Sequence, residues 1–263
     1  MEFTGERMFN RPGSDLYESH LLRYKFTRKF IINKFVLDIA CGIGYGTGYI
    51  AKYALNIVGA DVEEDVINYA RQHYKSKNIE FKLVSKNRRS KALVGQYDTI
   101  VCLETIEHTA KPQKFLTDIR SYLKKGRGII ILSTPNNFLK VHPPKNRFHT
   151  YEFDILELIN IIKKIIPSSR IEVYGQGKTN ITRYELKNAF KINDRRWFIK
   201  QLFGIICSFD AKYTHFLRRL EHLAIYKMVG VLQRDYQKTF KIYKIDPNKN
   251  FYNPEVSLIV IKV

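Results

Sequence analysis

The stretch FVLDIACGIGYG, from Phe35 to Gly46, decides the fold of this 263-residue chain. Its first five residues are mostly apolar and β-favouring, and they lead directly into a glycine cluster, Gly42, Gly44 and Gly46. A helical pattern comes next, so the order is strand, glycine-rich loop, helix. Glycine suits such a loop because the turn needs unusual dihedral angles and the backbone must approach a ligand closely.

The same alternation of strands and helices continues along the chain. Apolar, β-favouring runs predict further strands at 56–62, 79–84, 97–104, 127–136, 170–176 and 256–263. Helical patterns lie at 63–76, 111–126 and 153–166. This order predicts an α/β fold with a Rossmann-like, doubly wound sheet of seven strands. Ligands bind such sheets at the carboxyl ends of the strands.

The chain divides into four segments by its sequence pattern. We expect the core at residues 35–176, an insertion at 177–255 and the last core strand at 256–263. Residues 1–34 are expected to cover the cofactor or the substrate. The insertion has a mainly helical pattern and carries 16 lysines and arginines against 7 acidic residues. Its periodic apolar positions favour a packed cap, with a substrate lid, an oligomer interface and a membrane-surface contact as alternatives.

The composition argues against several classes of protein. The three cysteines are widely spaced and odd in number, so neither a disulfide framework nor a CxxC metal site is supported. The apolar runs are too short to span a membrane and the first residues do not resemble a signal peptide, so we expect a cytoplasmic protein. The net charge of +20 fits a polyanionic partner, but the joint abundance of lysine, isoleucine and asparagine favours biased residue usage.

Two motifs resemble those of the class I S-adenosylmethionine-dependent methyltransferases. VLDIACGIGYG, residues 36–46, is similar to their first motif, and VGADV, residues 58–62, to their second. The resemblance covers about residues 35–137 and implies S-adenosylmethionine as cofactor, with its methionine part against the glycine loop. Ser85 and Lys86 stand where the family usually has an acidic residue facing adenine, so adenine recognition stays unassigned. The cofactor-binding residues implied in this part are Asp38, Gly42, Gly44, Asp61 for the ribose, and Leu103.

The beginning of the chain shows a second resemblance. TGER, residues 4–7, is similar to the opening of bacterial methyltransferases that modify polysaccharides and nucleotide-sugars. Those proteins also carry an HLxRY element, which is residues 20–24 here. The resemblance implies that this segment folds over the cofactor, with Arg7 at the cofactor and His20 near the active site. The alternative is that Arg7 and Arg23 are surface cations.

The run ETIEH, residues 104–108, follows the fourth predicted strand and is therefore expected at the carboxyl edge of the sheet. If it forms one helical turn, Glu104, Glu107 and His108 converge on one face. Two carboxylates and an imidazole suit Mg²⁺ or Mn²⁺. The pattern ExxEH resembles the metal-dependent 2′-O-methyltransferases of small-RNA 3′ ends and the ubiquinone-biosynthesis O-methyltransferases. The former also use a later histidine, which would be His149 here.

We therefore predict a divalent-metal site formed by Glu104, Glu107, His108 and His149. The same prediction makes Glu107, His108 and His149 catalytic. The metal ion that they hold would chelate two adjacent hydroxyls of the acceptor and lower the pKa of the hydroxyl that is methylated. Two alternatives remain open: His108 acts as a base without a metal, or the run is a solvated turn. His142 and His20 are further candidates for the base.

The favoured function is an O-methyltransferase acting on a sugar hydroxyl, in a nucleotide-sugar or a surface polysaccharide. Methylation of the terminal 2′-hydroxyl of RNA, methylation of a small phosphorylated metabolite, and a catalytically silent scaffold are the alternatives. The expected partner is a sugar or nucleotide-sugar; nucleic acid is less favoured because no RNA-binding module is recognisable. Any peripheral membrane contact is expected to involve the basic insertion.

Overall fold

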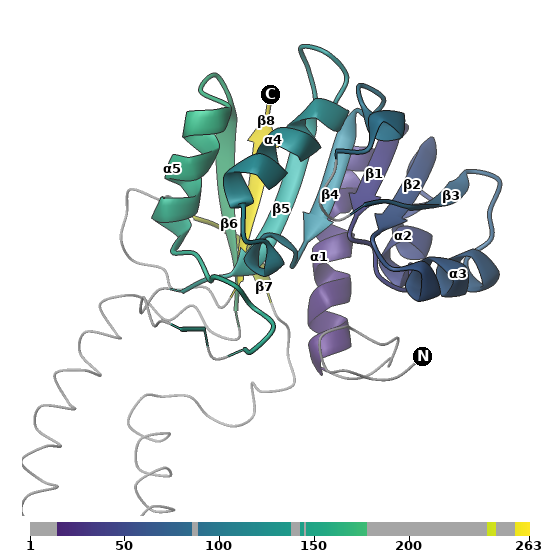
Figure 1. The fold of residues 1–263 in the computed structure, drawn as a ribbon, viewed down its shortest axis with the longest axis horizontal. Helices are drawn as coiled ribbons and strands as arrows, with labels where there is room; N and C mark the ends of the chain where they lie inside the picture. Colours follow the sequence, from purple (N-terminus) through teal and green to yellow (C-terminus); the bar gives the residue numbers. More distant parts are fainter. Residues whose placement is uncertain (1–14, 86–88, 138–142, 145, 178–240, 246–255) are drawn as a thin grey trace, which may run out of the picture. The chain divides into compact units, whose positions relative to one another are not determined.

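The structure is a computed structural model of the chain. It describes residues 15–85, 89–137, 143–144, 146–177, 241–245 and 256–263. Eight strands form one sheet in the order β3-β2-β1-β4-β5-β8-β6-β7, and helices lie on both of its faces (Figure 1). The predicted α/β, doubly wound fold is thereby confirmed. No helix in the described part of the chain is long and apolar enough to cross a membrane.

The elements follow the predicted alternation closely. The strands are β1 (Phe35–Ile39), β2 (Asn56–Asp61), β3 (Ile79–Leu83), β4 (Thr99–Leu103), β5 (Ile129–Pro135), β6 (Arg170–Gly177), β7 (Lys241–Ile245) and β8 (Val256–Lys262). The helices are α1 (Asp15–Ile31), α2 (Tyr45–Ile50), α3 (Glu64–His73), α4 (Pro112–Tyr122) and α5 (Ile155–Ile165). Two short 3₁₀ turns are η1 (Lys91–Leu93) and η2 (Ile106–His108).

Strand direction sets the location of any ligand site. β1 pairs in parallel with β2 and β4, and the parallel pairing extends outward to β3 and β5. β8 lies antiparallel between β5 and β6, and β7 adds an antiparallel edge strand. The carboxyl ends of β1 to β5 therefore meet at one edge, where the glycine loop and the ETIEH run both begin.

The predicted number of strands was wrong by one. Residues 241–245 were placed in the helical insertion, whereas the structure shows them as β7, paired antiparallel with β6. The sequence KIYKI is only five residues long, which is too short for its periodicity to separate a strand from a helical turn. Its partner strand, far away in sequence, determines its conformation.

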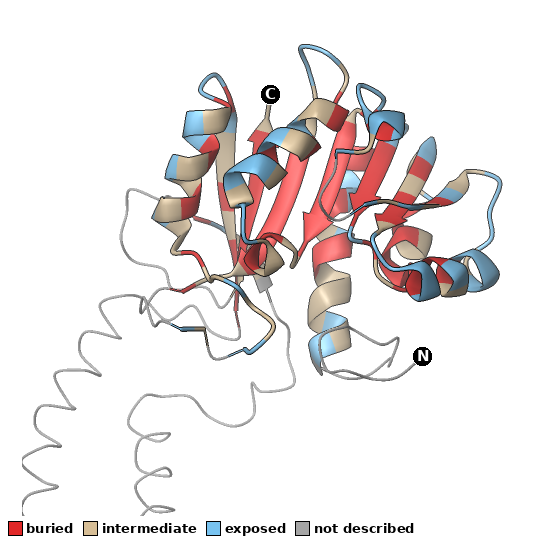
Figure 2. Ribbon diagram, in the orientation of Figure 1, coloured by how far each residue is buried: buried red, intermediate tan, exposed pale blue. Residues whose placement is uncertain are grey.

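The core has two layers, one on each face of the sheet, and Figure 2 shows the central strands buried along most of their length. On one face α4 and α5 pack apolar side chains against the strands: Leu116, Ile119, Leu158 and Ile162. On the other face α1, α2 and α3 do the same: Ile31, Ile50, Val66 and Ile67. Successive residues of a strand point to opposite faces, so Leu37 belongs to the first layer and Val36 to the second.

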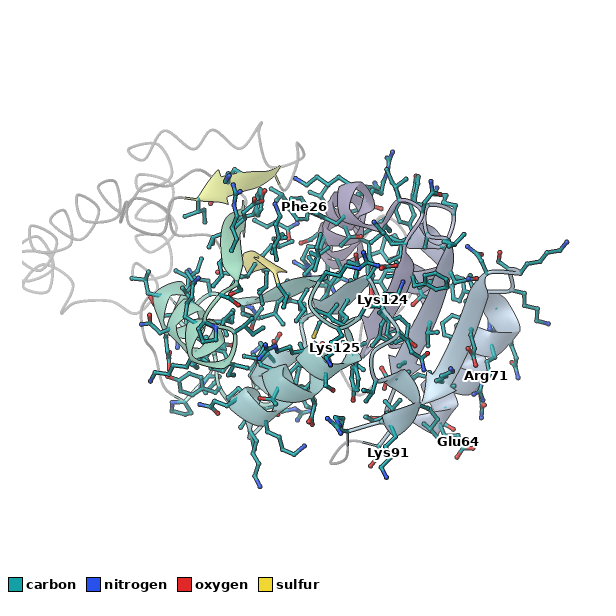
Figure 3. All side chains as sticks on the ribbon, turned by 90° about the horizontal axis from the view of Figure 1, so that it is seen from above. Phe26, Glu64, Arg71, Lys91, Lys124 and Lys125 are labelled. Atoms are coloured by element: carbon teal, nitrogen blue, oxygen red, sulfur yellow. The ribbon has the colours of Figure 1, made fainter. Side chains whose placement is uncertain are left out.

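Helix α1 was not predicted, because its buried face is partly polar. Arg23, Tyr24, Thr27 and Ile31 are all 3% exposed or less, and their spacing is that of one helix face. Two of these four residues are polar, so the apolar periodicity was weak. Phe26, labelled in Figure 3, also packs from α1 against Tyr174 of β6, with ring centroids 4.8 Å apart.

Replacing Gly46 by alanine is expected to lower the free energy of unfolding by about 2 kcal/mol or more. A Cβ atom at this position would lie 2.0 Å from the ring of Tyr24, which is 3% exposed and has little room to move. Gly42→Ala is the matched control, because that Cβ would meet nothing within 4 Å and would only strain a φ of +55°. Denaturant unfolding measures the free energy of unfolding of both variants. If Gly46→Ala loses no more of it than Gly42→Ala does, the proposed clash is contradicted.

Candidate active site

The glycine loop turns sharply after β1, and its conformation explains the glycines. Gly42 and Gly44 have φ angles of +55° and +82°, which favour glycine. The Gly42 amide donates a hydrogen bond to Oδ2 of Asp61 at 2.9 Å, and Oδ1 of Asp61 accepts from the Val62 amide at 2.7 Å. The predicted pair of loop and acidic residue thus lies together at the ends of β1 and β2.

Asp38 lies beneath the loop. The side chain is only 1% exposed, and its Oδ2 accepts hydrogen bonds from Thr47 at 2.6 Å and from the Tyr24 hydroxyl at 3.2 Å. Burial raises the pKa of this carboxyl to about 7, although both hydrogen bonds oppose the rise. Asp38 therefore joins Tyr24 of α1 to Thr47 of α2.

Asp38→Asn is expected to weaken the pH dependence of stability. The folded pKa of about 7 lies above the value of about 4 in an unfolded chain. The folded state therefore binds the proton more tightly, and the free energy of unfolding falls as pH rises through that window. Between about pH 5 and about pH 8, the free energy of unfolding measured with denaturant should fall less for the variant than for the wild type. The same fall in both proteins contradicts this role of Asp38.

Arg23 is the residue whose importance sequence reasoning missed. It was weighed as a surface cation, yet it is only 2% exposed. Burial raises the pKa of both the Glu107 carboxyl and the Tyr45 hydroxyl, and the positive charge of Arg23 opposes both rises. Its Nη1 donates to Oε1 of Gln176 on β6 at 2.7 Å. The HLxRY resemblance marked the position, but only the fold showed that the side chain is buried.

His20 lies one helical turn before Arg23 and contacts the glycine-loop side of the site. Its Nδ1 is hydrogen-bonded to the hydroxyl of Tyr45, the first residue of α2. Burial lowers the pKa of His20, and the nearby charge of Arg23 lowers it further. The predicted location beside the site fits this contact. Arg7, Lys86 and His142 lie outside the described residues, whereas Leu103 is the 5% exposed last residue of β4.

The predicted helical turn at ETIEH is wrong in its first residue. Glu104 has a φ of +51° and its amide donates to the carbonyl of Ser133 at 3.0 Å, so it still belongs to the β4–β5 edge. Only Ile106–His108 form the 3₁₀ turn η2. Oε1 of Glu104 accepts from the Ser133 hydroxyl at 2.7 Å. The structure therefore does not place Glu104 in the ligand cluster that was predicted for it.

The other three predicted ligands do lie together. One ligand atom each from Glu107, His108 and His149 fall within 4.8 Å of one another. The two imidazole rings meet edge to face, with centroids 5.0 Å apart. The amides of Thr150 and Tyr151 donate to the carbonyl oxygen of Glu107 at 2.8 and 3.2 Å, which holds the later loop against η2.

Hydrogen bonds fix the orientation of both imidazoles. Nδ1 of His108 donates to the Phe148 carbonyl at 2.9 Å, because a carbonyl oxygen can only accept. Nδ1 of His149 lies 2.6 Å from Oε1 of Glu152 and donates to it. In the neutral ring each Nε2 then keeps a lone pair. Nε2 of His149 lies 2.9 Å from the side-chain amide of the exposed Asn146, which must turn away before another ligand can bind.

Glu107 is a buried carboxylate with one oxygen left over. The residue is fully buried, its Oε2 accepts from Thr134 at 2.9 Å, and its Oε1 has no hydrogen-bond partner among the described residues. Burial raises its pKa well above the usual range, and the negative charge of Glu104 adds to the rise. A buried oxygen without a partner is costly, so this atom is the strongest sign of a missing ligand.

Comparison with known proteins shows what the core is similar to. Residues 37–129 match a family model described as a methyltransferase domain. A ubiquinone biosynthesis O-methyltransferase of Hydrogenovibrio crunogenus is 31% identical over 129 residues, covering 48% of this chain and 53% of that protein. The mitochondrial protein of the same name in Saccharomyces cerevisiae is 35% identical over 107 residues, covering 40% and 34%. These names contradict the predicted sugar acceptor and give no support to a role in polysaccharide modification.

The matches are partial, so they define a domain and leave the acceptor open. The chain spans between about half and two thirds of the length of the first curated relatives that it matches. A relative in Mycolicibacterium smegmatis, 28% identical over 62% of this chain and 64% of its own length, is named for dependence on S-adenosylmethionine.

Solved structures confirm the fold. An S-adenosylmethionine-dependent methyltransferase of Thermotoga maritima has a TM-score of 0.55 at 13% identity, covering 94% of this chain and 95% of its own. The [4+2]-cyclase SpnF has a TM-score of 0.56 at 12% identity, covering 96% and 85%. A cyclase with this fold shows that the architecture alone does not fix the reaction. Residues 37–129 therefore match a methyltransferase domain, and the chain has the fold seen in S-adenosylmethionine-dependent methyltransferases.

Proposed function

We propose that this chain is an S-adenosylmethionine-dependent O-methyltransferase whose acceptor is a hydroxylated aromatic precursor of a quinone. The observation that carries the proposal is the similarity to ubiquinone biosynthesis O-methyltransferases, since the domain match includes both the glycine loop and the ETIEH run. Phenolic hydroxyls also suit the site, because their pKa of about 10 brings the ionised form within reach of modest stabilisation.

The donor fits the residues beside the glycine loop. Asp61 presents a carboxylate at the end of β2, where it can accept hydrogen bonds from the two ribose hydroxyls. A Cβ on Gly42 would meet nothing within 4 Å, so the loop backbone is open to a ligand. Nε of Arg23 is buried without a hydrogen-bond partner among the described residues, which suits the carboxylate of the methionine part.

A divalent cation fits the cluster of Glu107, His108 and His149. The test is the unpaired Oε1 of Glu107, a buried oxygen that a cation would satisfy. Both histidines carry the outer hydrogen bond that orients a metal-binding imidazole. A bound Mg²⁺ or Mn²⁺ would supply positive charge that favours the ionised form of an acceptor hydroxyl. Glu104 is not part of this proposal, because it does not belong to the group whose ligand atoms lie within 4.8 Å of one another.

The residues of the chain have three tasks in such a reaction. Methyl transfer from the sulfonium to a hydroxyl releases one proton, so the site must accept it as the new carbon–oxygen bond forms. The unprotonated Nε2 of His108 is available for that proton when no cation is bound, and this is the rival metal-free mechanism. The glycine loop and Asp61 orient the donor, and burial of Glu107 keeps water away from one side of the cluster.

The deciding experiment is a methyl-transfer assay with catechol and hydroquinone acceptors, with and without a chelator. Transfer that disappears in chelator and returns with Mg²⁺ or Mn²⁺ supports both the acceptor class and the cation. Full activity in chelator supports the metal-free mechanism with His108 as base. Absence of transfer to every hydroxylated aromatic, despite binding of S-adenosylhomocysteine, rules out the acceptor class.

Glu152→Gln is expected to weaken Mn²⁺ binding about tenfold, because the outer partner of a metal-binding histidine typically contributes that much. The glutamine keeps an acceptor for His149 but loses the negative charge that makes the imidazole a stronger ligand. Calorimetric titration with Mn²⁺ measures the change. Glu157→Gln is the matched control, since Glu157 accepts from Tyr151 in the same segment, whereas the carboxylate hydrogen-bonded to His149 is that of Glu152. Unchanged affinity in Glu152→Gln contradicts the role of the pair.

A further inference from the structure

Arg23 is unusual because it is a buried cation for which the described part of the chain offers no anionic partner. Its residue exposure is 2%, and no carboxylate of the described residues lies within ion-pair distance of it. Its Nε also has no hydrogen-bond partner there. Buried charges in folded proteins are normally paired, since removing an ion from water is costly. Among the described residues its positive charge is therefore left without an ion pair, which suits an anionic ligand.

What holds the guanidinium is an amide. Nη1 of Arg23 donates to Oε1 of Gln176 at 2.7 Å, and Nε2 of Gln176 donates to the carbonyl of Ser19 at 2.9 Å. Gln176 lies on β6, is 1% exposed, and connects the sheet to α1 at Arg23 and at Ser19, one helical turn earlier. An arginine held by a carboxylate at this place would be neutralised by it.

We infer that Gln176 is a positioning residue that holds Arg23 in place without neutralising it, so that the guanidinium can bind the carboxylate of the donor. The inference rests on the proposed use of S-adenosylmethionine. It goes further in assigning a role to a residue on β6, outside the segment that matches the methyltransferase domain. The neutral amide accounts for two observations together: Nη1 of Arg23 is held by a hydrogen bond, and its Nε has no partner among the described residues.

The test compares two ligands that differ in the group under discussion. S-adenosylhomocysteine carries the amino acid carboxylate, whereas 5′-methylthioadenosine has the same adenosine but no amino acid part. Calorimetry should show that the wild-type chain binds S-adenosylhomocysteine at least tenfold more tightly, as expected for a charge-assisted hydrogen bond. This comparison needs no variant, and equal affinities for the two ligands overturn the inference.

Two substitutions separate charge from position. Gln176→Glu keeps an acceptor for Arg23 but adds a negative charge. We expect it to lower the affinity for S-adenosylhomocysteine about tenfold or more and to leave the affinity for 5′-methylthioadenosine unchanged. Gln176→Met removes both hydrogen bonds without adding a charge, so its effect on S-adenosylhomocysteine should be smaller. Thermal unfolding checks that both variants are folded.

The outcomes distinguish the inference from the function on which it rests. If Gln176→Glu binds S-adenosylhomocysteine as tightly as the wild type, or weakens both ligands equally, Gln176 has no charge-preserving role. An equal loss in Gln176→Met and Gln176→Glu leads to the same conclusion. If the wild-type chain binds neither ligand, the proposed methyltransferase function itself fails.

Discussion

Replacing Glu107 by glutamine is expected to lower the rate of methyl transfer at least a hundredfold, or about 2.7 kcal/mol in transition-state stabilisation. The substitution keeps the size of the side chain and the acceptor for Thr134, but it removes the charge from the unpaired oxygen. A cation would lose its only carboxylate among the three clustered residues. Initial rates at saturating donor, with and without Mn²⁺, measure the effect.

The same substitution should stabilise the fold, which separates a functional role from a structural one. Burial raises the pKa of Glu107, so the folded chain binds this proton more tightly than the unfolded chain. The free energy of unfolding therefore falls as pH rises from the unfolded pKa toward the folded one, and glutamine avoids that loss. In the absence of added metal, Glu107→Gln should be the more stable protein at about pH 8 and the difference should shrink toward about pH 4.

Glu104→Gln is the matched control for Glu107. Both carboxylates come from ETIEH, but Glu104 is hydrogen-bonded to Ser133 and lies outside the cluster. We expect it to keep activity within about tenfold of the wild type. A hundredfold loss in both variants would restore the four-residue site first predicted, and full activity in Glu107→Gln would remove the metal site altogether.

The sheet could be predicted because its pattern is local. β1 and β4 are short apolar runs that end in a glycine loop and in the ETIEH run, and both signals are complete within a dozen residues or so. β7 and α1 could not be predicted in this way. Their conformations depend on contacts far away in sequence: β7 pairs with β6, and α1 buries polar side chains under the glycine loop and against β6.

In the candidate site, too, features with a local sequence signal could be predicted and features that depend on distant contacts could not. The resemblance assigned both Gly42 and Asp61 to the cofactor, and the structure joins them by a hydrogen bond, because neighbouring parallel strands bring their carboxyl ends to one edge. The position of Glu104 depended on where β4 stops pairing with β5, and no local signal marks that residue. Arg23 and Gln176 are 153 residues apart, so their hydrogen bond could only be found in the folded chain.

Asp61→Ala is expected to lower the affinity for S-adenosylhomocysteine about a hundredfold, because the variant loses two charge-assisted hydrogen bonds to the ribose. The substitution also frees the Gly42 amide, which Asp61 now holds at 2.9 Å, so the loop loses a support as well. Calorimetry measures the affinity, and thermal unfolding separates loss of binding from loss of folding. Glu64→Gln is the matched control, because this carboxylate of α3, labelled in Figure 3, is exposed.

The two ends of the donor can then be mapped independently. The ribose is common to S-adenosylhomocysteine and 5′-methylthioadenosine, so Asp61→Ala should weaken both ligands by the same factor. Gln176→Glu should weaken only the ligand that carries a carboxylate. Because the two side chains act on different parts of the donor, their effects on S-adenosylhomocysteine should add in the double variant. A selective loss of one ligand in Asp61→Ala, or unchanged affinity for both, contradicts the assignment of the ribose to Asp61 and requires a different orientation of the donor on the glycine loop.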